Sequence, residues 1–156
     1  MRLNELIDAF AEKVGGDFTV EDGMVMLGID DMSVTIQELD EVGRIATYAE
    51  IGEPPPERLE KLYEAMLAAN HLFAGTAGST ISFDTESRRF YLCRTDVADV
   101  MDADGFMAML EKFVNTLEIW RKLLADYRSD GAQAAEKPAA EDAPFSGSFS
   151  ADFLRA

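Results

Sequence analysis

The chain has 156 residues, a length that suits one domain built around a single hydrophobic core. Its 30 acidic residues against 14 basic ones give a net charge of −16, which makes nucleic acid and anionic membrane surfaces poor partners. Polar groups interrupt the apolar residues near the N-terminus, and no apolar run reaches transmembrane length, so we expect neither a signal peptide nor a membrane span. The only cysteine, Cys93, excludes an intramolecular disulfide and fits a reducing cytoplasm.

A helix and three strands are predicted in the first third of the chain. The helix ends at Gly15–Gly16, and its apolar residues recur at helical spacing: Leu3, Leu6, Ile7, Phe10 and Val14. From Phe18 to Ile51 the apolar period changes to that of strands. We therefore expect three antiparallel strands, joined by turns at Asp30–Asp31 and Asp40–Glu41.

A second helix, a hairpin and a third helix follow. Pro54–Pro56 cannot continue a strand and sets the second helix to begin near Glu57. Two short apolar strands then flank a turn at residues 84–87, and Asp102 is the predicted N-cap of the last helix. The apolar stripe of that helix is Phe106, Met109, Leu110, Phe113, Leu117, Trp120, Leu124 and Tyr127. The order of helix, three antiparallel strands, helix, two-strand hairpin and helix predicts an α+β fold.

The composition changes after Ser129 to Ala, Glu, Pro, Gly and Ser, which bury too little apolar area to offset the entropy of ordering. We expect a folded domain over residues 1–128 and a flexible acidic tail over residues 129–156. The tail ends in apolar residues spaced like the anchors of a short helix: Phe145, Phe149, Phe153 and Leu154. Two interpretations stay open, a disordered end and a segment that docks on its own or a neighbouring chain.

Signatures of catalysis and of metal binding are weak. His71 is the only histidine, so one His and one Cys are too few for a zinc site, and nothing marks a partner for a His-based triad. Residues 102–105 lack the spacing of a calcium loop, and the glycine-containing residues 75–80 lack the Lys of a phosphate-binding loop. We expect no enzyme, no metal and no cofactor; a small hydrolase that depends on His71 is the remaining enzymatic alternative.

The first predicted strand is apolar on both faces. Val25, Leu27 and Ile29 alternate with Met24 and Met26, so helices on one side of the sheet cannot cover both sets. The uncovered apolar surface predicts an interface with a partner. The several methionines of the chain suit a surface that adapts to varied apolar partners.

One stretch of the sequence carries a family pattern. It consists of a helix ending in Leu67-Ala68-Ala69-Asn70, an apolar hairpin over residues 78–92, and a helix with Phe113 and Trp120. With the leading helix and strands, this pattern resembles the class I type III secretion chaperones, the Tir-chaperone or CesT-like family, up to about Tyr127. The resemblance implies a cytoplasmic bacterial homodimer that holds the N-terminal region of a secreted effector in an extended form, without ATP and without a reaction. A regulatory protein of the same fold that binds a folded partner is the alternative.

The pattern and the resemblance together suggest where the partners bind. We expect effector contacts on the first helix and the first sheet, at Leu6, Phe10, Val25, Leu27, Ile29, Val34, Ile36 and Ile45. The resemblance places the dimer interface on the middle helix and the second hairpin, at Leu62, Met66, Phe90 and Leu92. For each of these residues, a place in the core of the single chain is an equally good interpretation. If the expected effector contacts prove to be core residues, the effector-binding groove would lie on the opposite face, at Met24, Met26 and Thr35. The tail is expected to compete with effector for an apolar groove.

Overall fold

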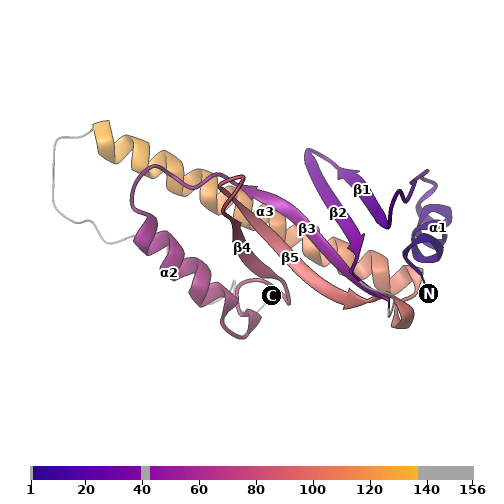
Figure 1. Cartoon of the computed structure of the whole chain (residues 1–156). Helices are drawn as coiled ribbons and strands as arrows, with labels where there is room; N and C mark the ends of the chain where they lie inside the picture. Colours follow the sequence, from indigo (N-terminus) through magenta and orange to yellow (C-terminus); the bar gives the residue numbers. More distant parts are fainter. Residues whose placement is uncertain (1, 40–42, 137–156) are drawn as a thin grey trace.

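The computed structural model of the chain describes residues 2–39 and 43–136 (Figure 1). The helices are α1 (Leu3–Val14), α2 (Leu59–Asn70) and α3 (Ala103–Glu136), with short 3₁₀ helices η1 (His71–Phe73) and η2 (Ala98–Val100). The strands are β1 (Met24–Ile29), β2 (Met32–Glu38), β3 (Arg44–Gly52), β4 (Thr80–Asp84) and β5 (Arg89–Val97). The predicted α+β class and order of elements are confirmed.

The strands form one antiparallel sheet in the order β1-β2-β3-β5-β4. β3 and β5 are neighbours although α2 and β4 lie between them in sequence, so β1 and β4 become the two edges of the sheet. Ile29 pairs with Met32 across the predicted Asp30–Asp31 turn, where Asp30 has a φ of 53°. The turn expected at Asp40–Glu41 lies outside the described residues.

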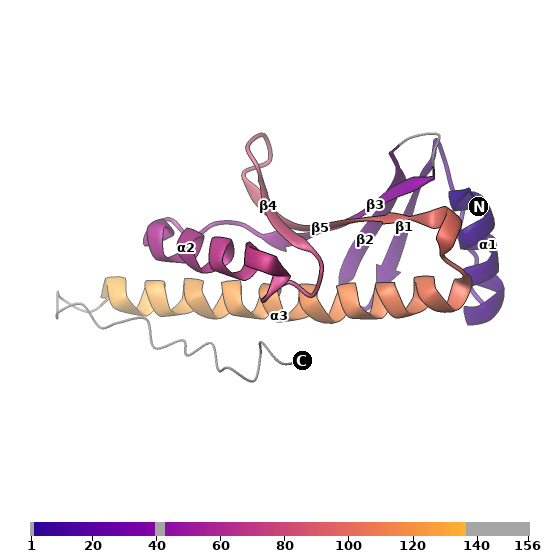
Figure 2. The same cartoon turned by 90° about the horizontal axis from the view of Figure 1, so that it is seen from below.

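The long helix α3 covers one face of the sheet, while α1 packs beside its first turns and α2 lies along its C-terminal half (Figure 2). Asp102 caps α3, because its Oδ1 accepts a hydrogen bond from the N–H of Gly105 at 2.8 Å. Every residue of the predicted stripe is buried, from Phe106 to Tyr127. The helix continues through Glu136, so the domain end expected at residue 128 falls inside α3.

Two junctions fix the other helices on α3. At its start, the ring of Phe10 on α1 packs edge-on against Phe106 with ring centroids 5.1 Å apart. At its far end, Arg58 donates a hydrogen bond from Nη2 to the carbonyl oxygen of Tyr127 at 2.8 Å, and the Tyr127 hydroxyl donates to the carbonyl of Arg58 at 2.6 Å. The C-terminal part of α3 is therefore held beside the beginning of α2, and α1 lies at the opposite end.

Candidate functional site

The residues expected to contact an effector lie in the core of the single chain. Their side chains are no more than 7% exposed, apart from Ile29, which is half-buried against the same core. On β1, Val25 and Leu27 face α3, whereas Met24 and Met26 are on the opposite face and are 37% and 66% exposed. The alternation was read correctly from the sequence, but only the position of α3 decides which face is covered.

The residues expected at a dimer interface are also buried within the single chain. Leu62 and Met66 of α2 and Phe90 and Leu92 of β5 are at most 6% exposed. They join α2 to the inner face of the sheet, as the contact between Tyr63 and Phe90 illustrates with ring centroids 6.0 Å apart. A second chain would therefore meet the outer side of these elements.

The uncovered face of the sheet carries a continuous row of side chains across all five strands. The cross-strand pairs that form the row are Met26 with Thr35, Thr35 with Tyr48, Tyr48 with Cys93, and Cys93 with Thr80. No described helix packs on this face (Figure 2). The alternative effector-binding groove expected from the sequence consists of Met24, Met26 and Thr35. Because Thr35 is only 8% exposed, only the two methionines present substantial surface to a partner.

The β1 edge of the sheet offers backbone groups to a partner. Residues 29 and 32 close a two-residue hairpin, and the N–H of Glu38 donates to the carbonyl of Gly23 at 2.8 Å. Because bonded and non-bonded pairs alternate in an antiparallel ladder, the N–H and C=O groups of Met26 and Gly28 point away from β2. Exposed backbone groups beside an exposed methionine make this edge suited to pairing with an added strand.

Asn70 closes part of the other edge of the sheet. Its Nδ2 donates to the carbonyl of Ile81 at 3.0 Å, and its Oδ1 accepts from the N–H of Ile81 at 2.8 Å. The side chain thus imitates a neighbouring strand at the second residue of β4. Sequence reasoning noted this residue as the end of the Leu-x-x-Asn pattern but found no role for it, because its partner lies in a later element.

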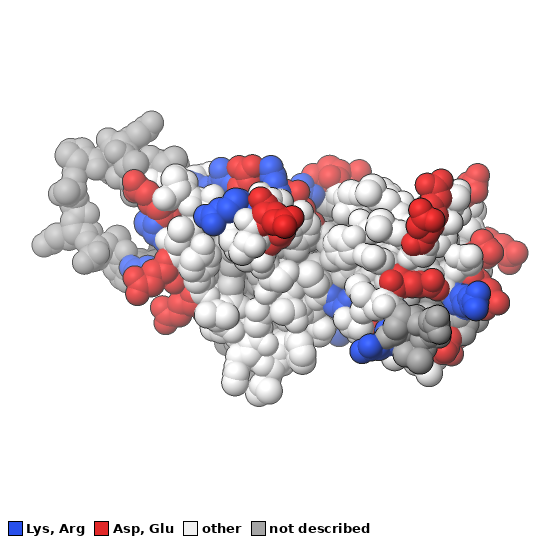
Figure 3. All heavy atoms as spheres, in the orientation of Figure 1, with Lys and Arg blue, Asp and Glu red and all other residues white. Residues whose placement is uncertain are grey.

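A second exposed apolar surface lies at the end of α2. We name it the α2–η1 surface, and its residues, with their exposed fractions, are Tyr63 (37%), Leu67 (70%), Leu72 (83%) and Phe73 (53%). The sequence from Ala65 to Phe83 contains no Asp, Glu, Lys or Arg, and the protrusion at the end of α2 shows neither blue nor red in Figure 3. Leu72 and Phe73 have φ values of 52° and 57°, an unfavourable conformation for apolar residues that holds them at the surface.

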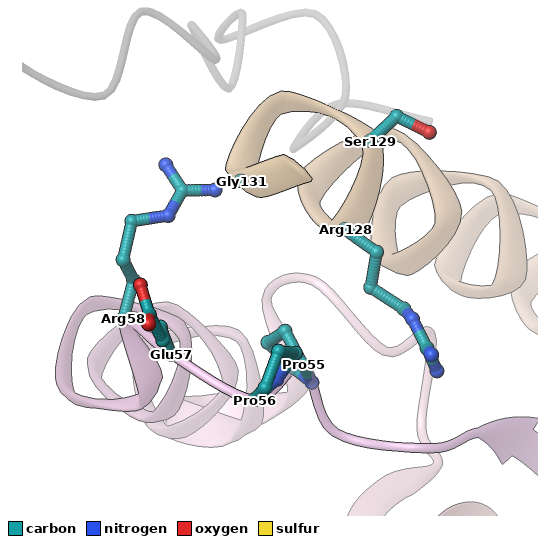
Figure 4. Close-up of a pocket in the computed structure, with 7 residues that line it drawn as sticks. All are labelled: Pro55, Pro56, Glu57, Arg58, Arg128, Ser129 and Gly131. Atoms are coloured by element: carbon teal, nitrogen blue, oxygen red, sulfur yellow. The ribbon is translucent and has the colours of Figure 1, made fainter. Parts of the chain in front are cut away.

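A pocket of about 390 Å³ opens where α2 begins beside α3. It is lined by Pro55, Pro56, Glu57, Arg58, Arg128, Ser129 and Gly131. Its two arginines do not converge: Arg58 reaches toward Gly131, and Arg128 points away to donate to the carbonyl of Glu53 at 3.0 Å (Figure 4). The pocket is therefore a structural junction and not an anion site.

Ionisable groups are engaged at the β4–β5 hairpin. Hydrogen bonds from the Ser87 side chain and from the backbone N–H groups of Glu86 and Ser87 lower the pKa of the Asp84 carboxyl. A hydrogen bond to Glu50, helped by the charges of Glu50 and Glu53, raises the pKa of Arg89. Within residues 2–39 and 43–136, no three His, Cys, Asp or Glu side chains are placed to hold a metal ion.

The comparisons with known proteins identify the family. No curated protein sequence matches the chain. Solved structures do: the HopA1–SchA chaperone–effector complex has a TM-score of 0.65 at 15% identity, covering 76% of this chain and 92% of that one. The ExsC–ExsE complex also has a TM-score of 0.65, at 22% identity, covering 80% and 97%. The Yersinia pestis type III secretion chaperone SycH, in complex with a fragment of YscM2, has a TM-score of 0.60 at 18% identity, covering 74% and 97%.

None of the helices in the described part of the chain is long and apolar enough to cross a membrane.

The structural likenesses agree with the match of the sequence to a protein-family model. The model of the Tir chaperone protein (CesT) family matches residues 5–121, which include all five strands and most of the helical residues. The chain therefore belongs to the Tir chaperone protein (CesT) family.

Proposed function

We propose that this protein is a cytoplasmic chaperone of type III secretion that binds an N-terminal segment of an effector in an extended form. The observation that carries the proposal is the β1 edge, where the backbone groups of Met26 and Gly28 point outward beside exposed methionine side chains. An extended segment can pair with these groups as an added strand and place alternate side chains against Met24 and Met26. Binding of this kind requires neither ATP nor a reaction.

The proposal includes a homodimer formed through the α2–η1 surface. Apolar side chains that are 53–83% exposed at Leu67, Leu72 and Phe73, within a segment that has no charged residues, suit a self-complementary contact. The buried residues that the sequence suggested, such as Leu62 and Leu92, would support this surface from beneath. The edge of β4 contributes fewer free backbone groups, because Asn70 occupies those of Ile81.

A proline substitution tests the strand-addition mode. Met26→Pro removes the outward-pointing N–H and leaves the β1–β2 ladder intact, because proline is tolerated where an edge N–H faces solvent. Its matched control, Met26→Ala, shortens the side chain but keeps that N–H. After the native partner has been identified by mass spectrometry of the co-purified complex, isothermal titration is expected to show that Met26→Pro weakens binding at least about tenfold more than Met26→Ala does.

Two results would contradict this function. Equal effects of Met26→Pro and Met26→Ala would show that no strand is added at β1. A co-purified partner that resists limited proteolysis as a folded domain would favour instead a regulatory protein of the same fold. If the effector is held in extended form, we expect limited proteolysis to cleave the effector residues on either side of the bound segment and to leave the bound segment itself intact.

A further inference from the structure

The α2–η1 surface lies within reach of the C-terminal residues of its own chain. Arg58 and Tyr127 hold the last turns of α3 beside the beginning of α2, and Arg58 Nη2 lies only 3.0 Å from the position that a Cβ on Gly131 would take. The 12 residues of α2 rise by about 18 Å from this junction to its C-terminal end. From Gly131, α3 continues to Glu136 over about 8 Å, and residues 137–144, fully extended, span about 26–29 Å, which just covers the return to the junction and the length of α2.

The proposed effector edge is much farther from the end of α3. The helix has 34 residues and is about 50 Å long, and α1 packs at its first turns through Phe10 and Phe106. β1 lies over the same half of α3 as α1 does (Figure 2). Residues 145–154 in helical form add about 15 Å to the roughly 26–29 Å of the preceding residues, so they fall short of α1 in the same chain, and the α2–η1 surface is the nearer of the two apolar surfaces.

The chemistry of the C-terminal residues matches the α2–η1 surface. Residues 137–156 carry three acidic and two basic side chains, so their net charge is only −1 in a chain of −16. Between Asp142 and Asp152 there is no charged residue, and the aromatic residues Phe145, Phe149 and Phe153 recur every four positions, as on one face of a helix. The surface they can reach is equally free of charge and carries exposed Leu67, Leu72 and Phe73.

We propose that residues 144–154 dock on the α2–η1 surface of the same chain and compete there with the second copy of the protein. Tethering supplies an effective concentration of the order of millimolar, so weak contacts suffice for the segment to occupy the surface. If each chain has its surface covered about 90% of the time, the dimer is weakened by up to about a hundredfold, because both surfaces must be free. This competition rests on the proposed dimer, whereas the docking itself does not.

The test uses the full chain and two matched triple variants. Phe145→Ser, Phe149→Ser and Phe153→Ser together remove the aromatic face, whereas Ser146→Ala, Ser148→Ala and Ser150→Ala change the same segment and keep it. Amide chemical shifts, measured below the concentration at which the chain dimerises, are expected to change at Leu67, Leu72 and Phe73 in the first variant only. Sedimentation equilibrium is expected to give that variant a dimer dissociation constant at least about tenfold lower than those of the wild type and the control.

The outcomes separate the docking from the dimer. Unchanged shifts at the α2–η1 surface, or changes confined to α1 and β1, would overturn the docking. Changed shifts with an unaltered dissociation constant would place the docked segment away from the dimer contact and overturn the competition. If none of the proteins dimerises, the proposed homodimer fails, and the chemical shifts still decide whether residues 144–154 dock.

Discussion

Asn70 illustrates how a single side chain can complete a sheet. It sits at the last position of α2 and supplies one donor and one acceptor to the backbone of Ile81, at 3.0 and 2.8 Å. Without these bonds, polar groups of a largely buried residue would have to be desolvated without a partner. The same amide also protects the first part of β4 from pairing with unrelated strands.

Replacing this amide should measurably destabilise the fold. Asn70→Ala removes both hydrogen bonds to Ile81, and we expect urea unfolding to show a loss of about 1–3 kcal/mol. Asn70→Asp keeps the acceptor for the N–H of Ile81 but sets a carboxylate oxygen against the Ile81 carbonyl oxygen, so it should lose at least as much. A loss below about 0.5 kcal/mol for Asn70→Ala would mean that water replaces the side chain and that the bonds contribute little.

At the scale of elements, α2 and η1 combine a buried and an exposed apolar side. Met66 faces the sheet at 4% exposure, while Leu67 beside it is 70% exposed. Two residues with positive φ then turn the chain at η1 and keep Leu72 and Phe73 outside the core.

The exposed side of these elements can be changed without damage to the fold. Asn tolerates positive φ better than most residues, so Leu72→Asn with Phe73→Asn removes apolar surface while retaining the backbone conformation. We expect unchanged thermal unfolding and at least a tenfold weaker dimer by sedimentation equilibrium, at a cost of about 1.4 kcal/mol or more. Val100→Asn, 86% exposed on η2, is the control that should leave the dimer unaltered. In a chain that also carries Phe145→Ser, Phe149→Ser and Phe153→Ser, so that no aromatic segment competes, a dimer of normal strength in the double variant would exclude this surface.

At the scale of the whole molecule, the two-layer arrangement separates stability from binding. α3 and the inner face of the sheet form the core, and the outer face and the two ends of the molecule remain for partners (Figures 1 and 2). Apolar side chains that share a strand therefore have different roles. Val25 and Leu27 stabilise the fold, and Met24 and Met26 are available for contact.

Substitutions on the two faces should separate these roles. Ile36 is fully buried, so Ile36→Asp places an unpaired carboxylate in the core and is expected to cost more than about 4 kcal/mol, with loss of the folded circular dichroism signal. Met26→Lys, on the exposed face, should retain the unfolding midpoint and lose partner binding. A folded Ile36→Asp variant with impaired binding would instead place Ile36 in the partner site, as the sequence pattern suggested.

The sequence by itself determined the elements, their order and the periodicity of their buried faces. Phe106, Phe113 and Trp120 were assigned to one buried stripe, and Asp102 to a cap, because helical spacing and capping depend on neighbouring residues. Only the tertiary structure decided that α3 covers the face of Val25 and leaves that of Met26 open, and that Asn70 pairs with Ile81. These choices depend on contacts between segments far apart in the chain, and a local pattern of alternation is compatible with either face being covered.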